Sequence, residues 1–460
     1  MSSSCVQALR RAGIHEVIAP TDPGFDGARR VWNGAIDRRP AAVVRCGTAD
    51  EVVKAVRVGR ESGLPLAIRG GAHNAAGFGT CDGGLVIDLG RMKGIQVDPE
   101  RRVAVVQPGV LWRELDRATQ IFSLATPGGI VSNTGIAGLT LGGGIGWLMG
   151  VHGLTVDNLL GAEMVTAEGE VVRADATSHP DLFWALRGGG GNFGVVTRFD
   201  YHLHPHGPTV LGGLVLWPIG EGREVLEHYR DYSSALPDDA EAFAAVLTVP
   251  DVGPAVAIIT GYNGDLAEGT RVCARAGAVG HPVVNTIGPM THVDRQGMLD
   301  DGNAEHGLRR YWKSGYSETL SDEMIRCLLE AGRSFPSAEC SMLAMRIHGA
   351  ATRVPNDGTA FALRGEKWDL NLVGQWREPE ESARHLAWVR RWWEEVEPLT
   401  SGLVYINHLA GDDGQERARR SFGDNYQRLA FIKGRYDPDN VWHLNPNILP
   451  TPQPGASPPL

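Results

Sequence analysis

Residues 128–147 read GGIVSNTGIAGLTLGGGIGW, and glycine alternates there with Ile, Val and Leu. No common secondary structure tolerates so many glycines, because each one weakens a helix or strand interior. A flexible linker is the alternative, but linkers are polar and this stretch is apolar between its glycines. Glycine also serves where the backbone approaches a ligand closely. We therefore predict that residues 128–147 lack regular structure and line the pocket of a large, flat ligand.

A second glycine loop, RGGAHN at residues 69–74, follows the apolar stretch PLAI, which reads as a strand. Consecutive backbone N–H groups in such a turn can hold an anion such as a pyrophosphate. His73 within the loop could act as a nucleophile, a base or a covalent anchor. The alternative for this segment is a plain turn with a hydrogen-bonding histidine.

A third cluster, RGGGGNFG at residues 187–194, contains a formal match to the GxGxxG dinucleotide fingerprint. That fingerprint needs a strand before it and a helix after it. Here the preceding PDLFWALRG reads as a helix and the following VVTRFDYHLH reads as a strand. The order is reversed, so we exclude a Rossmann-type NAD site.

The bulk composition narrows the class of protein. The chain has 460 residues and a net charge of -10, and this acidic balance disfavours nucleic acid as a partner. The sequence has no secretory leader pattern and no apolar run long enough for a membrane helix, so we expect a cytoplasmic protein. Six cysteines without CxxC spacing are expected to be reduced and mostly buried.

We predict no metal site. His202, His204 and His206 alternate and could share a strand face, but Pro205 breaks the strand and no acidic or cysteine partner is near in sequence.

The pattern of elements predicts an α+β chain of two lobes. A lead-in at 1–24 precedes a mixed lobe at 25–205, in which short strands alternate with helices. A second lobe at 206–410 carries longer strands, among them GLVYIN at 402–407, and helices on one face of an antiparallel sheet. A segment at 411–450 follows, ending in a stretch too rich in Asn and Pro for regular structure. Residues 451–460 are expected to be disordered.

Several segments together resemble one known family. They are RGGAHN (69–74), TGIAGLTLGGGIGW (134–147), GLTVDNLL (153–160), PDLFWALRGGGGNFGVVT (180–197) and YDPDNVWHLNPNILP (436–450). In this order and spacing they resemble the berberine-bridge-enzyme-like FAD-linked oxidases, a branch of the vanillyl-alcohol-oxidase, or PCMH-type, flavoproteins that also holds 6-hydroxy-D-nicotine oxidase. The resemblance runs from about residue 32 to residue 450.

The resemblance implies a PCMH-type FAD-binding lobe, completed by residues 411–450, with the substrate-binding lobe inserted between. The family attaches the 8α-methyl group of the flavin to the histidine that corresponds to His73. The other residues expected at the cofactor are Arg69, Gly70, Gly71, Ala72, Asn74, Val131, Thr134, Gly135, Gly138, Gly142, Gly143, Gly144, Gly146, Asn192, Gly194, Val195, Asn445 and Asn447.

Two positions depart from the family pattern. The family loop is usually RGGGH, and here Ala72 replaces the third glycine. Many members form a second flavin link from a cysteine eleven residues before GGG, where this chain has Val131. No thiol is available there, so we expect FAD to be held by a single histidyl link.

The cofactor implies the chemistry. Flavin N5 takes hydride from a small organic substrate, often a secondary metabolite in this family, and O2 reoxidises the ring to give H2O2. We therefore expect an oxidase or oxidative cyclase that is a monomer or homodimer and has no membrane partner. The alternatives are a flavin dehydrogenase that does not use O2 and a non-catalytic flavin-binding protein.

The second lobe supplies the candidate bases. Tyr405 and Asn407 form a Y-x-N that resembles the family's strand near the active site, and a tyrosine beside a cation can take a substrate proton. Tyr316 with Lys313 is a second candidate pair. Arg346 and His348 alternate on a predicted strand and are expected to share one face. For each residue the alternative is a packed side chain or a solvated charge.

Overall fold

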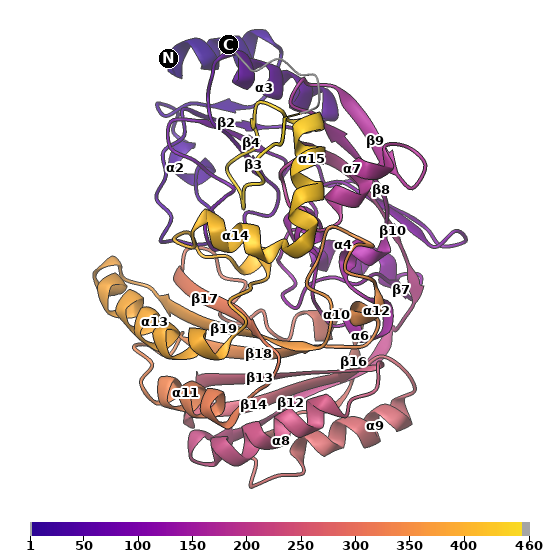
Figure 1. Cartoon of the computed structure of the whole chain (residues 1–460), viewed down its shortest axis with the longest axis vertical. Helices are drawn as coiled ribbons and strands as arrows, with labels where there is room; N and C mark the ends of the chain where they lie inside the picture. Colours follow the sequence, from indigo (N-terminus) through magenta and orange to yellow (C-terminus); the bar gives the residue numbers. More distant parts are fainter. Residues whose placement is uncertain (1, 453–460) are drawn as a thin grey trace.

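The structure of the protein is a computed structural model that describes residues 2–452. Two parts are stacked along the long axis of the molecule (Figure 1). One part holds two small sheets and the C-terminal helices, and the other holds one large antiparallel sheet with helices on its outer side. The predicted α+β class is confirmed. Of the predicted tail, residues 453–460 lie outside the described residues.

A four-stranded sheet carries the RGGAHN loop. Its strands β2 (Ala42–Arg45), β4 (Leu85–Asp88) and β3 (Leu66–Arg69) run parallel, and β1 (Val17–Ile18) pairs antiparallel with β2. Helix α3 (Ala49–Glu61) begins at Thr48, whose hydroxyl accepts the N–H of Glu51 at 3.2 Å, as the sequence predicts for an N-cap. Because β3 ends at Arg69, the loop lies at the carboxyl edge of parallel strands, where such sheets bind ligands.

A five-stranded antiparallel sheet forms the rest of the first part. Helix α7 (Pro180–Leu186) precedes the third glycine cluster, and strand β10 starts directly after it. This is the helix-then-strand order predicted from the sequence, so the exclusion of a Rossmann-type fingerprint holds. The strands, in sheet order, are β5 (Ile95–Asp98), β6 (Val103–Val106), β10 (Val195–His202), β8 (Leu159–Val165) and β9 (Val171–Asp175).

The second part is built on an eight-stranded antiparallel sheet. Its long central strands pair over many residues, and the hairpin of β13 and β14 keeps register from Ala240 opposite Tyr262 to Val249 opposite Gly253. In sheet order the strands are β15 (Val284–Asn285), β12 (Thr209–Pro218), β14 (Gly253–Tyr262), β13 (Ala240–Val249), β18 (Ser341–Ile347), β19 (Lys367–Trp376) and β17 (Arg309–Ser317), with β16 (Gly288–Thr291) also pairing with β12.

The two faces of this sheet have different neighbours. Ala242 and Ala244 of β13 face a core formed with the covering helices, whereas Phe243 between them packs with Trp147 of the glycine stretch. This alternation is the period of two expected of a strand buried on both faces. This face of the sheet packs on Ile145 and Trp147 of the glycine stretch, and Figure 1 shows it turned toward the first part of the molecule. The covering helices are α8 (Gly222–Ser234), α11 (Asp322–Arg333) and α13 (Ser382–Val396), with α9 (Leu266–Ala274) near the sheet edge.

The C-terminal segment returns to the first part of the molecule (Figure 1). Helices α14 (Gln415–Ser421) and α15 (Tyr426–Tyr436) lie there, and α15 contacts α7. Lys433 Nζ donates to the carbonyl oxygen of Asn192 at 2.6 Å, and Asn192 Oδ1 accepts the N–H of Ile448 at 3.0 Å. The last described residues are thus bonded to the third glycine cluster.

Two predictions of local structure are wrong. Part of the glycine stretch forms helix α5 (Ile136–Gly142), because Ile136 and Leu141 are buried in the main core and their packing offsets the weak helix propensity of glycine. The predicted strand at 402–407 is a 3-10 turn at Ile406–His408. Residues 401–403 make two backbone hydrogen bonds with Tyr316 at the end of β17, and the chain then turns toward the glycine stretch.

Other features match expectation. All six cysteines are buried free thiols, as predicted.

Within residues 2–452, no helix combines the length and apolar character needed to cross a bilayer. The remaining elements are α1 (Ser2–Arg11), α2 (Phe25–Ala28), α4 (Trp112–Gln120), β7 (Leu124–Ala125), α6 (Met149–His152), the 3-10 turn η1 (Thr155–Asn158), β11 (His204–Pro205), α10 (His292–Gln296) and α12 (Ala350–Arg353).

Candidate active site

Glycines from two of the predicted loops border open space. Gly138 in α5 is exposed between the buried Ala137 and the half-buried Leu139, and a Cβ added there would meet no atom within 4 Å. At Gly190 and Gly191 the nearest atoms to an added Cβ are 3.7 and 4.0 Å away. We call the space beside Gly138, Gly190 and Gly191 the cofactor hollow, because it is where the glycine loops predict a ligand to lie against the backbone.

Two asparagines of the C-terminal segment have buried side-chain oxygens without partners, and one of them lies at the third glycine cluster. Among the described residues, Oδ1 of Asn445 and Oδ1 of Asn447 are buried and have no hydrogen-bond partner. The amide nitrogen of Asn445 donates to the carbonyl oxygen of Gly191 at 3.3 Å, which places this side chain at the third glycine cluster. Buried acceptors without a donor are uncommon in folded proteins, and the hydroxyl and N–H groups of FAD would satisfy them.

The RGGAHN loop is pressed against the glycine stretch. A Cβ on Gly71 would lie 2.5 Å from the Cα of Gly135, so neither position accepts a side chain. Ala72, which stands where the family has glycine, has a φ of 58°, a left-handed conformation that glycine adopts more easily. Asn74 and Gly70 are half-buried at this edge.

Arg69 does not extend toward the hollow. Its guanidinium donates to Asp88 at 2.7 Å and to the carbonyl oxygens of Ala28 and Arg30. These bonds hold the end of β3 to β4 and to the N-terminal segment. The guanidinium is thus occupied by protein partners, and a contact of Arg69 with the cofactor stays a prediction.

The imidazole of His73 is held from two sides. The ring of Trp32 stacks on it with centroids 4.1 Å apart, and Nε2 lies 3.1 Å from Oδ1 of Asn133. The guanidinium of Arg310 lies 3.7 Å from the Trp32 ring. Burial and the charge of Arg310 lower the pKa of His73 to about 3, so the imidazole is neutral at pH 7.

Tyr405 and Asn407 meet the glycine stretch together. The hydroxyl oxygen of Tyr405 accepts the N–H of Gly144 at 2.8 Å and the amide of Asn407 at 2.7 Å. A Cβ on Gly142 would lie 2.2 Å from Oδ1 of Asn407, so this contact needs glycine. Burial raises the pKa of Tyr405, and its two N–H donors oppose that rise.

A buried acid next to Tyr405 was missed by the sequence analysis. Asp369 of β19 is fully buried, and Oδ2 lies 3.1 Å from Nδ1 of His408 in an ion-pair contact. The His408 ring lies edge-on to the Tyr405 ring, 4.8 Å between centroids. The hydroxyl of Ser314 and the amide of Asn371 donate to the Asp369 carboxylate. Only the fold brings β19 to the turn at Ile406–His408, so spacing along the chain gives no signal for this group.

The candidate pair of Tyr316 and Lys313 is not a pair. Tyr316 is buried beside Tyr405 in the core between the sheet and the glycine stretch, and burial raises its pKa well above the ordinary value. Lys313 is three residues away on β17 and so faces the other side of the sheet. Its ammonium is 2.8 Å from both Asp412 and Asp413. The structure therefore separates Lys313 from Tyr316.

Arg346 and His348 also have separate surroundings. Arg346 donates to the carbonyl oxygen of Ser233 in helix α8, on the outer face of the sheet. His348 lies beyond the end of β18 and contacts the buried carboxylate of Glu241 at 3.2 Å. The prediction of a shared face fails because the strand ends at Ile347.

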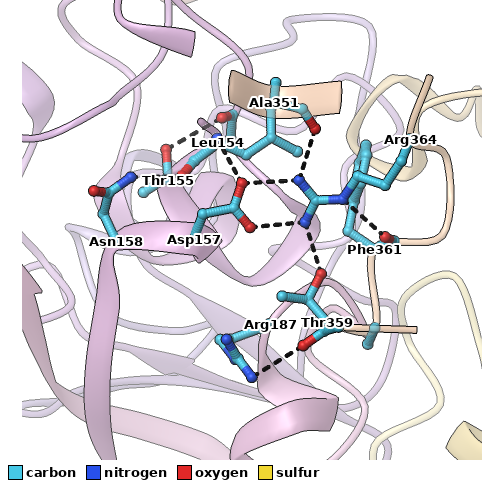
Figure 2. Close-up of polar contacts among 12 residues, drawn as sticks. Leu154, Thr155, Asp157, Asn158, Arg187, Ala351, Thr359, Phe361 and Arg364 are labelled. Atoms are coloured by element: carbon cyan, nitrogen blue, oxygen red, sulfur yellow. Dashed lines mark hydrogen bonds and ion pairs between the residues drawn. The ribbon is translucent and has the colours of Figure 1, made fainter. Parts of the chain in front are cut away.

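An ion pair holds the loop between β18 and β19 against the first part of the molecule (Figure 2). Arg364 makes two hydrogen bonds of 2.8 Å to the carboxylate of Asp157, which lies in the segment GLTVDNLL. Its other N–H groups donate to the carbonyl of Ala351, the hydroxyl of Thr359 and, at 3.3 Å, the carbonyl of Phe361. All five donors of this buried guanidinium are used. The loop thereby holds the Phe361 ring, which is 6.1 Å from the Tyr405 ring.

The remaining predicted cofactor residues lie along the same region. Val131 and Thr134 are half-buried in the glycine stretch. Gly143, Gly146, Gly194 and Val195 are buried, and added Cβ atoms at these glycines would clash with neighbouring atoms. Asn192 donates to the carbonyl oxygens of Gly189 and Pro446 and so ties the third cluster to the C-terminal segment. The three glycines pack against other parts of the protein, and the contact of these residues with the cofactor stays a prediction.

The three alternating histidines belong to a separate cluster. His204 stacks on His152 with centroids 3.7 Å apart, and His206 Nε2 lies 3.1 Å from His292 Nδ1. Burial lowers the pKa of His204 and of His292 to about 3 and that of His152 to about 4. Within residues 2–452, no group of three or more His, Cys, Asp or Glu side chains is arranged to hold a metal ion.

The fold and the hollow between its glycine loops define a two-part flavoprotein, and comparison with known proteins agrees. Residues 40–175 match the family described as "FAD binding domain", and residues 404–449 match "Berberine and berberine like". The chain is 32% identical to an FAD-linked oxidoreductase of Dictyostelium discoideum over 91% of each chain. It is 30% identical to (R)-6-hydroxynicotine oxidase of Paenarthrobacter nicotinovorans over 98% of this chain and 99% of that one.

A solved structure gives the same result. The crystal structure of 6-hydroxy-D-nicotine oxidase from Arthrobacter nicotinovorans superposes with a TM-score of 0.84 at 28% identity and covers 94% of this chain and 97% of that chain. The protein belongs to the berberine-bridge-enzyme-like FAD-linked oxidoreductases. It is an FAD-linked oxidase of small organic substrates.

Proposed function

We propose that this enzyme carries FAD covalently on His73 and oxidises a small alcohol, amine or phenolic secondary metabolite, with Tyr405 as the base. When bound, FAD supplies the hydride acceptor, and O2 is the final acceptor and leaves as H2O2. The observation that carries the proposal is the position of the Tyr405 hydroxyl, bonded to the N–H of Gly144 on the glycine stretch. The proton acceptor and the wall of the cofactor hollow are thus in direct contact.

Tyr405 is a neutral phenol at rest, because burial raises its pKa. It acts as a base only if its own proton leaves as the substrate proton arrives. The candidate acceptor for that proton is the pair of Asp369 and His408, whose imidazole lies edge-on to the Tyr405 ring, and Asp369 is held in place by Ser314 and Asn371. The N–H groups of Gly144 and Asn407 stabilise the negative charge that develops on the phenol oxygen in this exchange.

The side chains around Tyr405 indicate the kind of substrate. Tyr316 and Phe361 share its apolar core, and no described Lys or Arg side chain donates a hydrogen bond to its hydroxyl. Such surroundings favour an apolar or aromatic substrate with one ionisable O–H or N–H over a polyanion. The relative that oxidises (R)-6-hydroxynicotine acts on a compound of this kind.

The test begins with the cofactor. The purified enzyme is denatured in acid, the pellet is washed, and its visible spectrum is compared with that of His73→Ala. We expect a yellow wild-type pellet and a colourless variant pellet. A colourless wild-type pellet with FAD in the supernatant would contradict the covalent link.

The second stage tests the reaction with a panel of alcohols, amines and phenols. We expect at least one compound to bleach the flavin without O2 and to yield H2O2 in air. Bleaching with turnover only on an artificial acceptor would instead identify an O2-independent dehydrogenase. A flavin that no compound bleaches would support the non-catalytic alternative.

A further inference from the structure

The orientation of the Asn133 side chain is fixed by its neighbours. Its Nδ2 donates to the carbonyl oxygen of Ala304 at 2.5 Å, in the segment between α10 and β17. A reversed amide would set Oδ1 against that carbonyl oxygen, two acceptors without a hydrogen between them. Oδ1 therefore faces His73, with Nε2 at 3.1 Å. The side chain is buried, so water does not compete for either bond.

This orientation determines where the imidazole of His73 carries its hydrogen. An amide oxygen only accepts hydrogen bonds, so Nε2 must be the donor. The ring is neutral, because burial and the charge of Arg310 lower its pKa to about 3. A neutral imidazole has one N–H, and that N–H is on Nε2. Nδ1 is left with the free electron pair, which is what a nucleophile needs.

The ring is also fixed in its plane and in its charge state. Trp32 stacks on it at an interplanar angle of 18°, and Trp32 is itself covered by Arg310. The guanidinium of Arg310 is buried, and its bonds go to backbone carbonyls and to the neutral amide of Gln375. No carboxylate is bonded to it within the described residues, so its positive charge opposes protonation of His73.

From this arrangement we infer that Asn133 is a positioning residue for flavin attachment, which it directs to Nδ1 of His73. The inference rests on the covalent link proposed above. Nδ1 forms the new bond to the 8α-methyl carbon, and one C–H bond of that methyl group and the Nε2–H bond break. The two protons and two electrons released pass to O2, which leaves as H2O2. Asn133 Oδ1 accepts the hydrogen bond of the departing Nε2 proton until it is lost.

The experiment follows the rate of attachment. The full chain is produced in a riboflavin-starved host and mixed with FAD in air, and samples are quenched in acid over time. Flavin fluorescence of the denatured protein and the mass of the His73 peptide report the link. Asn133→Leu has a similar size but no acceptor, and we expect its attachment to be about 10-fold slower or more, as the loss of a buried hydrogen bond implies. Asn133→Asp keeps an acceptor for Nε2 but loses the donor to Ala304, so we expect a rate between those of Asn133→Leu and the wild type.

Two controls separate positioning from folding. Asn303→Leu removes an amide that donates to Leu299 in the same segment but does not touch His73, and it should attach flavin normally. Native FAD bound by Asn133→Leu before quenching shows that the pocket is formed. NMR spectra of the purified histidyl-flavin peptide identify the substituted nitrogen, which we expect to be Nδ1.

The outcomes are distinct. A link through Nε2 in the wild type, or attachment by Asn133→Leu at the wild-type rate, overturns the role of Asn133 and leaves the covalent link intact. A wild-type chain that releases all its FAD in acid overturns both this inference and the covalent part of the proposed function. Slow attachment by Asn303→Leu as well would mean that the whole segment matters rather than Asn133, and would also overturn the inference.

Discussion

The carboxylate of Asp157 and the guanidinium of Arg364 form two parallel hydrogen bonds of 2.8 Å between residues 207 positions apart in the sequence. Both side chains are buried, with 9% and 3% exposure. Parallel bonds of this kind are the strongest arrangement of an Arg–carboxylate pair. The pair joins the segment after the glycine stretch to the loop that carries Phe361.

Breaking this pair should destabilise the enzyme strongly. Arg364→Ala leaves the carboxylate of Asp157 buried without its partner, and we expect a loss of about 3–5 kcal/mol in the free energy of unfolding. Denaturant unfolding followed by fluorescence measures it. Arg353→Ala breaks the exposed pair with Asp238 and should leave the free energy of unfolding nearly unchanged. Equal effects of the two variants would contradict a special role for the buried pair.

Gly138 offers a test of the cofactor hollow that does not depend on the substrate. Gly138→Leu places a side chain in space that is open in the structure, so the chain should fold normally. We expect much less bound FAD, measured as visible absorbance per protein. Gly27→Leu, in helix α2, is the matched control, because an added Cβ there also meets nothing within 4 Å. Full flavin content in Gly138→Leu would show that this residue does not line the cofactor site.

Tyr405→Phe should separate chemistry from binding. The variant keeps the ring in its core and loses the hydroxyl, so FAD should stay bound while kcat falls by about 10²–10⁴, the usual range for a general base. Steady-state kinetics with the substrate found in the panel measures it. Lys313→Met removes the cation paired with Asp412 and Asp413 and should lower stability with little effect on kcat. If kcat instead fell in Lys313→Met and stayed unchanged in Tyr405→Phe, Lys313 would be the better candidate for the base.

The histidine cluster should make the enzyme sensitive to acid. The pKa of His204 is about 3 in the folded chain and near 6.5 when unfolded, so only the unfolded chain takes up its proton between those values. The contribution of His204 to the free energy of unfolding is therefore fully present above pH 6.5. It decreases as the pH falls below that value, by up to about 1.4 kcal/mol per pH unit for this one group.

Replacing His204 tests that slope. His204→Gln can still donate to Asn158, as the histidine does at 2.6 Å, but it does not titrate. We expect a shallower loss of unfolding free energy between pH 6.5 and 4, measured by denaturant titrations across that range. His281→Gln changes a ring that is 95% exposed and should leave the slope as it is. A slope unchanged in His204→Gln would assign the acid sensitivity to other groups.

The sequence was sufficient for the parts of the site that are local in the chain. Glycine-rich loops mark where backbone meets backbone or ligand, and the helix before and strand after residues 187–194 followed from their apolar pattern. Prediction of secondary structure from the sequence was less reliable where tertiary packing overrides the local preference of the residues. Helix α5 forms despite its glycines because Ile136 and Leu141 are anchored in the core.

The partners of the candidate side chains could not be read from spacing. Asp369 and His408 are far apart in sequence and meet only because β19 passes beside the turn that carries Tyr405. In the same way, Trp32, Asn133 and Arg310 come to His73 from three separate segments. Lys313 was a plausible partner for Tyr316 because the two are close in sequence, and only the fold shows that Lys313 is paired with two aspartates instead.

The bonds between Asn192 and the segment around Pro446 have a consequence for how the enzyme matures. One wall of the cofactor hollow is supplied by residues that lie 254 positions downstream of the glycine cluster they contact. The wall is therefore incomplete until the segment around Pro446 has been synthesised and has docked on Asn192. A chain cut before Pro446 should carry no flavin, even where its other sheets fold.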